Sequence, residues 1–319
     1  MNASKIHVFA PATVANVACG FDILGFALDM PGDEVIMQKT ARSGVNILRI
    51  TGDGGRLPLD AAKNTAGVAV LSFLKYINAK EGVELELYKH LPLGSGLGSS
   101  SASAVAAVYA ANQLFGAPLK TEELLPFTMD AEKVACGSAH ADNVAPCLMG
   151  GIVLIRSYQP LDVIRIHVPE KLYCAVVTPS LEVRTEDARR ILRKEISFKD
   201  AVMQWGNIAG LIAGFQQSDY ALIGRSLKDV IVEPVRSLLI PGFDELKEKV
   251  IQAGALGCSI SGSGPSVFAL FDTKQKADES AVIMKEVFGG HGIDSITYVS
   301  TINKEGPRVI KANETVISH

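Results

Sequence analysis

Leu91-Pro-Leu-Gly-Ser-Gly-Leu-Gly-Ser-Ser-Ser-Ala-Ser103 is the stretch that decides the fold. Its three glycines, Gly94, Gly96 and Gly98, alternate with other residues and run into serines, and an alanine-rich segment follows over 102–111. Glycine lets backbone N–H groups turn toward an anion without a Cβ in the way. Serine caps helix starts, and a helix N-terminus attracts phosphate. The stretch therefore predicts a phosphate-binding loop that leads into a helix, and it favours a phosphoryl-transfer enzyme.

Two common phosphate-binding motifs do not fit this loop. No lysine follows the last glycine, so it is not a Walker A loop, and the glycines are spaced two apart, so it is not the dinucleotide fingerprint. A Gly/Ser-rich loop without a ligand remains the alternative on composition alone. The preceding segment, Val83–Tyr88, alternates apolar and polar residues as a strand does. The loop is thus expected between a strand and a helix, the setting a phosphate site requires.

Composition limits the possible partners. The chain has 319 residues, 48% of them hydrophobic but only 6% aromatic, so small aliphatic packing must dominate the core. The net charge is −3 and no basic run occurs, which argues against a nucleic-acid partner. The apolar segment 102–111 is too short to span a membrane. Five scattered cysteines without a C-x-x-C pair favour free thiols and a cytoplasmic location.

The order of elements predicts an α+β protein with two units, 1–160 and 161–319. Strands are expected in the first unit over 5–18, 33–51, 83–88 and 152–155, with helices over 64–78, 102–111 and 121–135. The second unit is expected to hold strands over 163–168, 173–178 and 296–301 and helices over 186–194, 198–217, 244–253 and 274–288. The sole tryptophan, Trp205, lies in an apolar helical segment and is expected in the core.

Three separated blocks resemble those of the GHMP small-molecule kinases. They are Pro11-Ala-Thr-Val-Ala-Asn-Val-Ala-Cys-Gly-Phe-Asp-Ile-Leu-Gly25, the loop from Pro92 to Ala102, and Ser259-Ile-Ser-Gly-Ser-Gly-Pro-Ser266. The segments Gly137–Pro146, Arg184–Arg189 and Val232–Arg236 are most similar to the branch of that family that phosphorylates L-homoserine. The resemblance extends over nearly the full chain.

This resemblance implies both a fold and a reaction. The N-terminal domain would resemble the second domain of ribosomal protein S5, the C-terminal domain would be a ferredoxin-like α+β sandwich, and the active site would lie in the cleft between them. The implied reaction converts ATP and L-homoserine to ADP and O-phospho-L-homoserine, on the route to threonine. Mg²⁺ as cofactor and a homodimer are also implied.

The resemblance assigns the nucleotide and the metal to the first domain. Glu132 would bind Mg²⁺ with a loop hydroxyl, Ser100 or alternatively Ser99, because Mg²⁺ prefers oxygen ligands; a solvated helix glutamate is the alternative from sequence alone. The C-terminal turn Ser261–Pro265 is expected to face the same cleft. The residues implied to bind ATP are Asn64, Lys89, Pro92, Leu93, Gly94, Ser95, Gly96, Leu97, Gly98, Ser99, Ser100 and Ser101.

A zwitterionic amino acid needs a carboxylate for its ammonium and a guanidinium for its carboxylate. Asp22 would take the ammonium, and Arg189 and Arg236 would clamp the carboxylate, with Arg184 as the alternative to Arg189. The residues implied to line the rest of the homoserine site are Asn16, His140, Asn143 and Thr185. Among these, Asn16 and Asn143 join Glu132 as the implied catalytic residues.

Asn143 occupies the position at which related GHMP kinases carry a proposed aspartate base. An amide cannot accept the hydroxyl proton, so the expectation is that the γ-phosphate itself takes it. Asp142, one residue earlier, is the alternative base. A kinase for another small alcohol such as mevalonate, and a catalytically silent ligand sensor, are the alternative functions.

Overall fold

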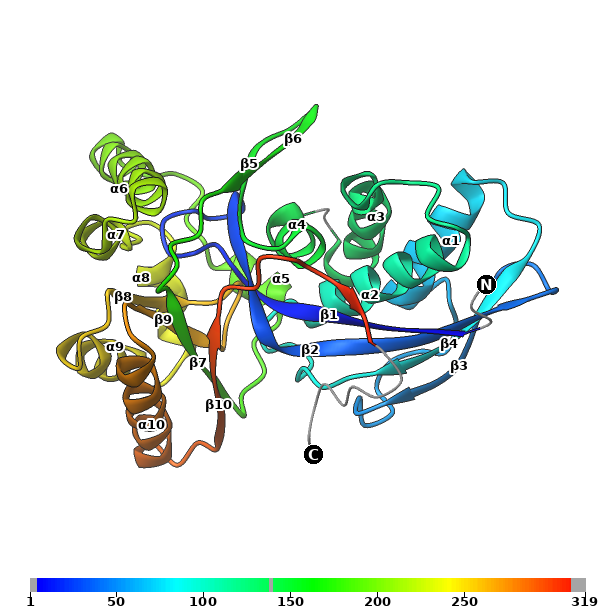
Figure 1. Ribbon diagram of the computed structural model, residues 1–319. Helices are drawn as coiled ribbons and strands as arrows, with labels where there is room; N and C mark the ends of the chain where they lie inside the picture. The colour runs from blue at the N-terminus through cyan, green and yellow to red at the C-terminus, as the bar shows by residue number, and fades with distance from the viewer. Residues whose placement is uncertain (1–4, 138–139, 311–319) are drawn as a thin grey trace.

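Two β-sheets with helices packed on them form the computed structural model, which describes residues 5–137 and 140–310 (Figure 1). The first sheet has the order β11-β1-β2-β4-β3, with β5 paired to β2 and β6 paired to β5. Its strands are β1 (Lys5–Ala15), β2 (Leu24–Thr40), β3 (Val45–Thr51), β4 (Gly82–Tyr88), β5 (Ile152–Tyr158), β6 (Leu161–Ile166) and β11 (Arg308–Val309). The 17-residue β2 pairs with β5 near its start and with β4 near its end, so it joins the two parts of this sheet.

Helices cover one face of this sheet because the strands alternate apolar and polar side chains. In β4, Val83, Leu85 and Leu87 are fully buried, whereas Glu84 and Glu86 on the other face are not. The helices of this domain are α1 (Thr65–Tyr76), α2 (Ser99–Leu114), η1 (Thr121–Leu124), α3 (Leu125–Cys136) and α4 (Ala141–Met149). The strand predicted over 83–88 and the helix predicted over 102–111 are confirmed, and the helix extends from Ser99 to Leu114.

Helix α2 lies at the centre of the first domain, buried on nearly every side. Its alanines and serines are small, which lets α1, α3, β1 and β2 approach it closely. The N-terminus of α2 is therefore fixed at one end of the domain core, and the phosphate-loop candidate is attached to it.

The second sheet has the order β10-β7-β9-β8, and all its neighbours are antiparallel. Its strands are β7 (Tyr173–Pro179), β8 (Gly257–Ile260), β9 (Val267–Phe271) and β10 (Ser295–Thr301). Its helices are α5 (Thr185–Arg190), α6 (Phe198–Gln217), α7 (Tyr220–Ser226), α8 (Glu233–Arg236), η2 (Ser237–Leu239), α9 (Phe243–Gln252) and α10 (Lys274–Gly290). Helices connect β7 to β8 and β9 to β10, which is the expected ferredoxin-like arrangement.

The change from one sheet to the other falls a few residues beyond the predicted boundary at 160. Strand β6, expected in the second unit, forms a hairpin with β5 and stays in the first sheet. Near the end of the described chain, β11 returns to pair with β1. The chain thus crosses between the sheets twice, which sequence periodicity cannot reveal.

The prediction that Trp205 lies in the core is wrong. Its side chain is 57% exposed on α6 and meets Phe198 edge to face, with ring centroids 5.8 Å apart. The helix buries Leu211 and Phe215 instead. In the described part of the chain, none of the helices combines the length and apolarity needed to cross a membrane.

Candidate active site

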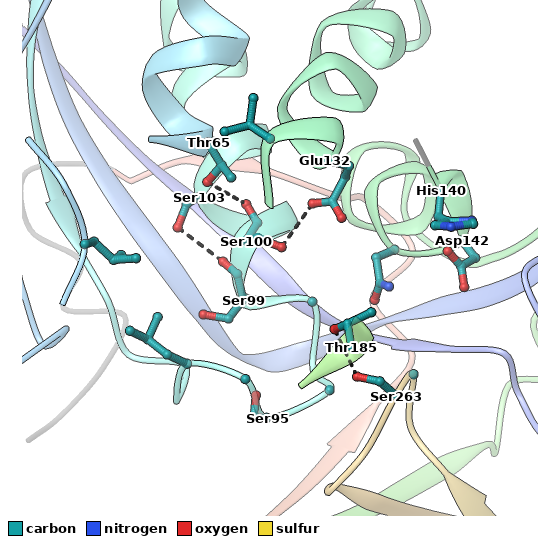
Figure 2. Close-up of a pocket in the computed structure, with 18 of the residues that line it drawn as sticks. Thr65, Ser95, Ser99, Ser100, Ser103, Glu132, His140, Asp142, Thr185 and Ser263 are labelled. Carbon is teal, nitrogen blue, oxygen red and sulfur yellow. Dashed lines mark hydrogen bonds between the residues drawn. The ribbon is translucent and has the colours of Figure 1, made fainter. Parts of the chain in front are cut away.

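The elements converge on a cleft of about 390 Å³ between the two domains. Figure 2 shows Ser99 and Ser100 at the start of α2, Glu132 beside them, His140 and Asp142 at one side, and Thr185 and Ser263 from the second domain. The predicted cleft and its two contributing Gly/Ser turns are therefore brought together.

The glycines of the first loop are required by geometry. Gly94, Gly96 and Gly98 have φ of 68°, 81° and 64°, a left-handed conformation that residues with a Cβ rarely adopt. A Cβ on Gly96 would lie 2.4 Å from the Ser261 carbonyl oxygen of the opposite turn. The Ser261 hydroxyl donates a hydrogen bond of 2.7 Å to the Gly96 carbonyl. The C-terminal turn thus holds the phosphate-loop candidate in place.

Gly98 brings the loop against the neighbouring side chains of the first domain. A Cβ at this position would lie 2.1 Å from Thr13 Oγ1 and 2.9 Å from Asn143 Oδ1. Thr13 Oγ1 itself donates to Asn143 Oδ1 at 2.7 Å. Because the amide oxygen of Asn143 accepts this bond, its Nδ2 donors are the groups left to meet a substrate oxygen.

Lys89 lines the cleft next to the loop and is held there by hydrogen bonds. Its ammonium donates to Asp33, to the Ser99 carbonyl at 2.7 Å and to Ser103 Oγ at 2.8 Å, which accounts for all three of its protons. Burial lowers the pKa of this ammonium, and the Asp33 carboxylate opposes that shift. Lys89 therefore fixes the first turn of α2.

Glu132 on α3 reaches the first turn of α2. Its Oε1 accepts hydrogen bonds of 3.0 Å from both Ser100 and Ser101, and the residue is 5% exposed (Figure 2). Ser99 and Ser100 both line the cleft, and the Ser99 hydroxyl donates to the Leu91 carbonyl at 3.3 Å. A carboxylate beside one hydroxyl fits Mg²⁺, which takes few protein ligands and completes its shell with phosphate oxygens and water. No cluster of three acidic, histidine or cysteine ligands occurs within residues 5–137 and 140–310.

Apolar side chains form part of the cleft lining. Asn64 caps α1 by accepting from the Ala66 N–H at 3.0 Å, and its Nδ2 donates to the Pro58 carbonyl at 3.0 Å. Leu57, Pro58, Leu93 and Val134 line this part of the cleft. Apolar walls with a few polar groups suit a nucleotide base.

The charged groups predicted for an amino acid lie at the other end. Arg189 donates two hydrogen bonds to the Asp22 carboxylate, at 3.0 and 2.8 Å. Arg236 is 3% exposed and donates to the Ala188 and Gly262 carbonyls at 3.2 and 2.8 Å. Burial lowers the pKa of Arg236 to about 10, with the Arg189 charge adding to the effect. Among the described residues Arg236 forms no ion pair, so this end of the cleft suits a bound anion.

The turn that carries Asp22 is strained. Asn16, Val17, Ala18 and Asp22 all have φ between 42° and 70°. A left-handed Val is unusual, and such backbone clusters at functional sites. The Asn16 side chain holds the turn by donating to the Gly262 carbonyl at 2.7 Å and accepting from the Asp22 N–H at 3.0 Å.

His140 and Asp142 complete this end of the cleft. Burial lowers the pKa of His140, whose Nδ1 lies 3.7 Å from Asp22 Oδ2. Burial, with the negative charges of Asp22 and Glu132, raises the pKa of Asp142 to about 7. Its buried Oδ1 has no hydrogen-bond partner in the described structure.

Most of the residues predicted for the site line the cleft, including Thr185, whose hydroxyl lies 3.3 Å from Ser263 Oγ. Pro92, Leu97 and Ser101 do not line it; Leu97 is fully buried and its carbonyl accepts from the Thr13 N–H. Ser138 and Ala139, within a segment that resembled the family, lie outside the described residues.

Sequence reasoning missed two supporting residues. Phe21 lies under both arginines, with its ring centroid 5.3 Å from the Arg189 guanidinium and 5.0 Å from that of Arg236. Tyr158 donates to the Asp22 carbonyl at 2.6 Å from a distant strand. The family block that includes Phe21 was the only signal for it, and nothing in the sequence linked Tyr158 to the site.

Comparisons with known proteins agree with this geometry. The family "GHMP kinases N terminal domain" matches residues 64–151, and "GHMP kinases C terminal" matches residues 211–289. The chain is 54% identical to a homoserine kinase of Chlorobium phaeovibrioides, covering 96% of this chain and 99% of that relative. It is 40% identical to one of Xylella fastidiosa, covering 97% and 95%.

Solved structures give the same result. The crystal structure of a homoserine kinase from Cytophaga hutchinsonii is 57% identical and superposes with a TM-score of 0.94, covering 96% of this chain and 98% of that one. The L. major mevalonate kinase in complex with R-mevalonate has a TM-score of 0.70 at 15% identity, covering 94% and 97%, which shows a shared fold.

Proposed function

The chain belongs to the homoserine kinases of the GHMP kinase family, and we infer from its cleft how it transfers the γ-phosphoryl group of ATP to the hydroxyl of L-homoserine. The observation that carries the proposal is the shared cleft: a phosphate-type loop at a helix N-terminus lies next to buried charges that suit a zwitterion. The product is O-phospho-L-homoserine, on the route to threonine.

The loop and the start of α2 would hold the triphosphate. Backbone N–H groups around Gly94–Gly98 and the positive end of the α2 dipole suit the phosphate oxygens. Glu132 and Ser100 would hold Mg²⁺, which neutralises phosphate charge when bound. Lys89 acts through the Ser99 carbonyl as a positioning residue.

Homoserine would lie between Asn143 and the arginines. Its carboxylate would bind Arg189 and Arg236, its ammonium Asp22, and its hydroxyl the Nδ2 of Asn143, next to the loop at Gly98. Asn16, His140 and Thr185 would line this pocket. Two guanidiniums on one carboxylate would reject alcohols that lack it, because the buried charges would remain unpaired.

The hydroxyl proton would pass to a γ-phosphate oxygen, since Asn143 cannot accept it. Asp142 is the other candidate, because it lies next to Asn143 and its Oδ1 has no hydrogen-bond partner among the described residues. The close contact of Gly98 with Asn143 favours Asn143 as the group beside the reacting oxygen.

ADP release tests this function directly. We expect saturable turnover with ATP, Mg²⁺ and L-homoserine, and none with mevalonate, L-threonine or L-serine. Turnover with mevalonate alone would retain the phosphate loop but reject the amino acid site. ATP binding without turnover of any substrate would instead favour a ligand sensor.

We also propose that the protein is a cytoplasmic homodimer. Four buried free cysteines, Cys19, Cys147, Cys174 and Cys258, support a reducing compartment. Phe198, Val202 and Trp205 lie on one side of α6 and are 77%, 51% and 57% exposed, and such apolar faces mark interaction surfaces. Light scattering should give the mass of a dimer, and that of a monomer for Phe198→Ser/Trp205→Ser; a monomeric parent protein would reject the dimer.

A further inference from the structure

The two groups proposed to bind the opposite ends of homoserine bind each other in this structure. Arg189 Nη1 and Nη2 donate to Asp22 Oδ2 and Oδ1, so the guanidinium fork and the carboxylate are fully matched. Asp22 belongs to the turn between β1 and β2, and Arg189 to α5 of the second domain. The pair therefore closes across the cleft at the site expected for the substrate.

Both partners are held in position by other groups. The Asp22 N–H donates to Asn16 Oδ1, and its carbonyl accepts from Tyr158. Arg189 stacks on Phe21, which also supports Arg236. Because neither partner is held by the other alone, the pair can separate without loss of the pocket.

Arg236 differs from Arg189 in its bonding. It donates to two backbone carbonyls, Ala188 and Gly262, and those bonds leave its Nη2 available for an anion. A carboxylate can therefore bind Arg236 without breaking an ion pair, whereas binding Arg189 requires Asp22 to be displaced.

We propose that the Asp22–Arg189 pair determines specificity: homoserine replaces it by exchange, its carboxylate taking Arg189 while its ammonium takes Asp22. This rests on the proposed function. A zwitterion leaves no charge unpaired. A ligand with a carboxylate alone would take Arg189 from Asp22 and leave that carboxylate without its guanidinium partner, with His140 Nδ1 at 3.7 Å from Asp22 Oδ2. A ligand with an ammonium alone would leave Arg189 close to the like charge of Arg236. The pair thus discriminates against half-charged analogues before any reaction occurs.

Calorimetric titration with L-homoserine and 4-hydroxybutyrate, which lacks the ammonium, tests the exchange. We expect Asp22→Asn to bind L-homoserine about tenfold more weakly than the parent protein, but 4-hydroxybutyrate about tenfold more tightly, because Arg189 is released. Asn tolerates the φ of 60° at this position. If Asp22→Asn binds 4-hydroxybutyrate no more tightly than the parent protein does, the proposal is overturned. That result would mean that Asp22 contacts the substrate ammonium but does not hold Arg189 away from the carboxylate.

The reciprocal variant provides an independent test. Arg189→Gln should bind 3-aminopropan-1-ol, which lacks the carboxylate, about tenfold more tightly than the parent protein. If Asp22→Asn does not fold, this measurement still tests the exchange. An unchanged affinity of Arg189→Gln for 3-aminopropan-1-ol would overturn the proposal.

Asp187→Asn is the matched control for charge. Asp187 lies two residues from Arg189 but pairs with Arg190 at 3.0 Å, so its loss should leave the affinity for 4-hydroxybutyrate unchanged. An equal gain in Asp187→Asn and Asp22→Asn would indicate a general field effect and reject the exchange. If the parent protein neither binds L-homoserine nor phosphorylates it, the proposed function itself fails.

Discussion

Glu132 is the one carboxylate that we propose as a ligand of Mg²⁺ in the cleft. Two serine hydroxyls already point to its Oε1, so a neutral glutamine can keep those bonds while losing the charge. We expect Glu132→Gln to lower kcat by about a hundredfold or more, because metal binding contributes several kcal/mol of charge stabilisation. The measurement is ADP release across a Mg²⁺ titration.

Asp130→Asn is the control for Glu132→Gln. Asp130 lies on the same helix, accepts from Ser72 at 2.8 Å and is about half exposed. Its loss should leave kcat unchanged. Equal activity of Glu132→Gln and the parent protein at all Mg²⁺ concentrations would show that Glu132 is not a metal ligand.

The burial of Asp142 makes the stability of the protein depend on pH. Its pKa is raised to about 7 in the folded protein, from about 4 in an unfolded chain. The folded state therefore binds more protons between these values, so this group's contribution to stability is complete below pH 4 and is lost as pH rises toward 7. The free energy of unfolding should therefore fall less between pH 5 and pH 8 in Asp142→Asn than in the parent protein. Urea unfolding at the two pH values measures this difference.

The same variant separates the two candidates for the proton acceptor. If the γ-phosphate takes the proton, Asp142→Asn should retain kcat within about tenfold, since general bases contribute about 10²–10⁴-fold. A loss of several orders of magnitude with homoserine still bound would establish Asp142 as the base.

At the scale of elements, the junction between the loop and α2 depends on Gly98. A Cβ there would collide with Thr13 and press on Asn143, so the loop would have to move. We expect Gly98→Ala to lower kcat/KM for ATP by about a hundredfold, because a misplacement of about 1 Å in an active site can cost that much. Steady-state kinetics check this.

Gly116→Ala provides the comparison at the other end of α2. Gly116 also has a positive φ, 86°, but a Cβ there would meet no atom within 4 Å. It should reduce the free energy of unfolding by about 1 kcal/mol and leave kcat/KM unchanged. If both variants lost activity alike, left-handed backbone strain rather than close contact would be the cause.

At the scale of the whole molecule, the two domains share packing. Phe26 of β2 meets Phe268 of β9 edge to face at 5.9 Å, and one apolar cluster includes residues of both sheets. We expect Phe268→Ala to cost about 3–5 kcal/mol, as for other buried aromatic residues, and the protein to unfold in one calorimetric transition. Two separate transitions, of which Phe268→Ala shifts only that of the second domain, would contradict this coupling.

Local sequence determined the elements and the conformation of the glycine–serine loop. The alternation in β4, the glycine–serine run and the alanine-rich helix each follow from backbone conformation and side-chain size over a few residues, and the structure confirms them. The family-specific blocks gave the residues that line the cleft, from Asn16 to Arg236. The local patterns can be predicted from sequence because their physical causes act between residues that are close together in the chain.

Only the tertiary structure decided how those residues interact. Three features depend on contacts between segments far apart in sequence. They are the ion pair of Asp22 with Arg189, the ion pair of Lys89 with Asp33, and the exposure of Trp205. The return of β6 and β11 to the first sheet has the same origin. Burial and charge pairing are set by the surroundings of a side chain, and those surroundings exist only after the chain has folded.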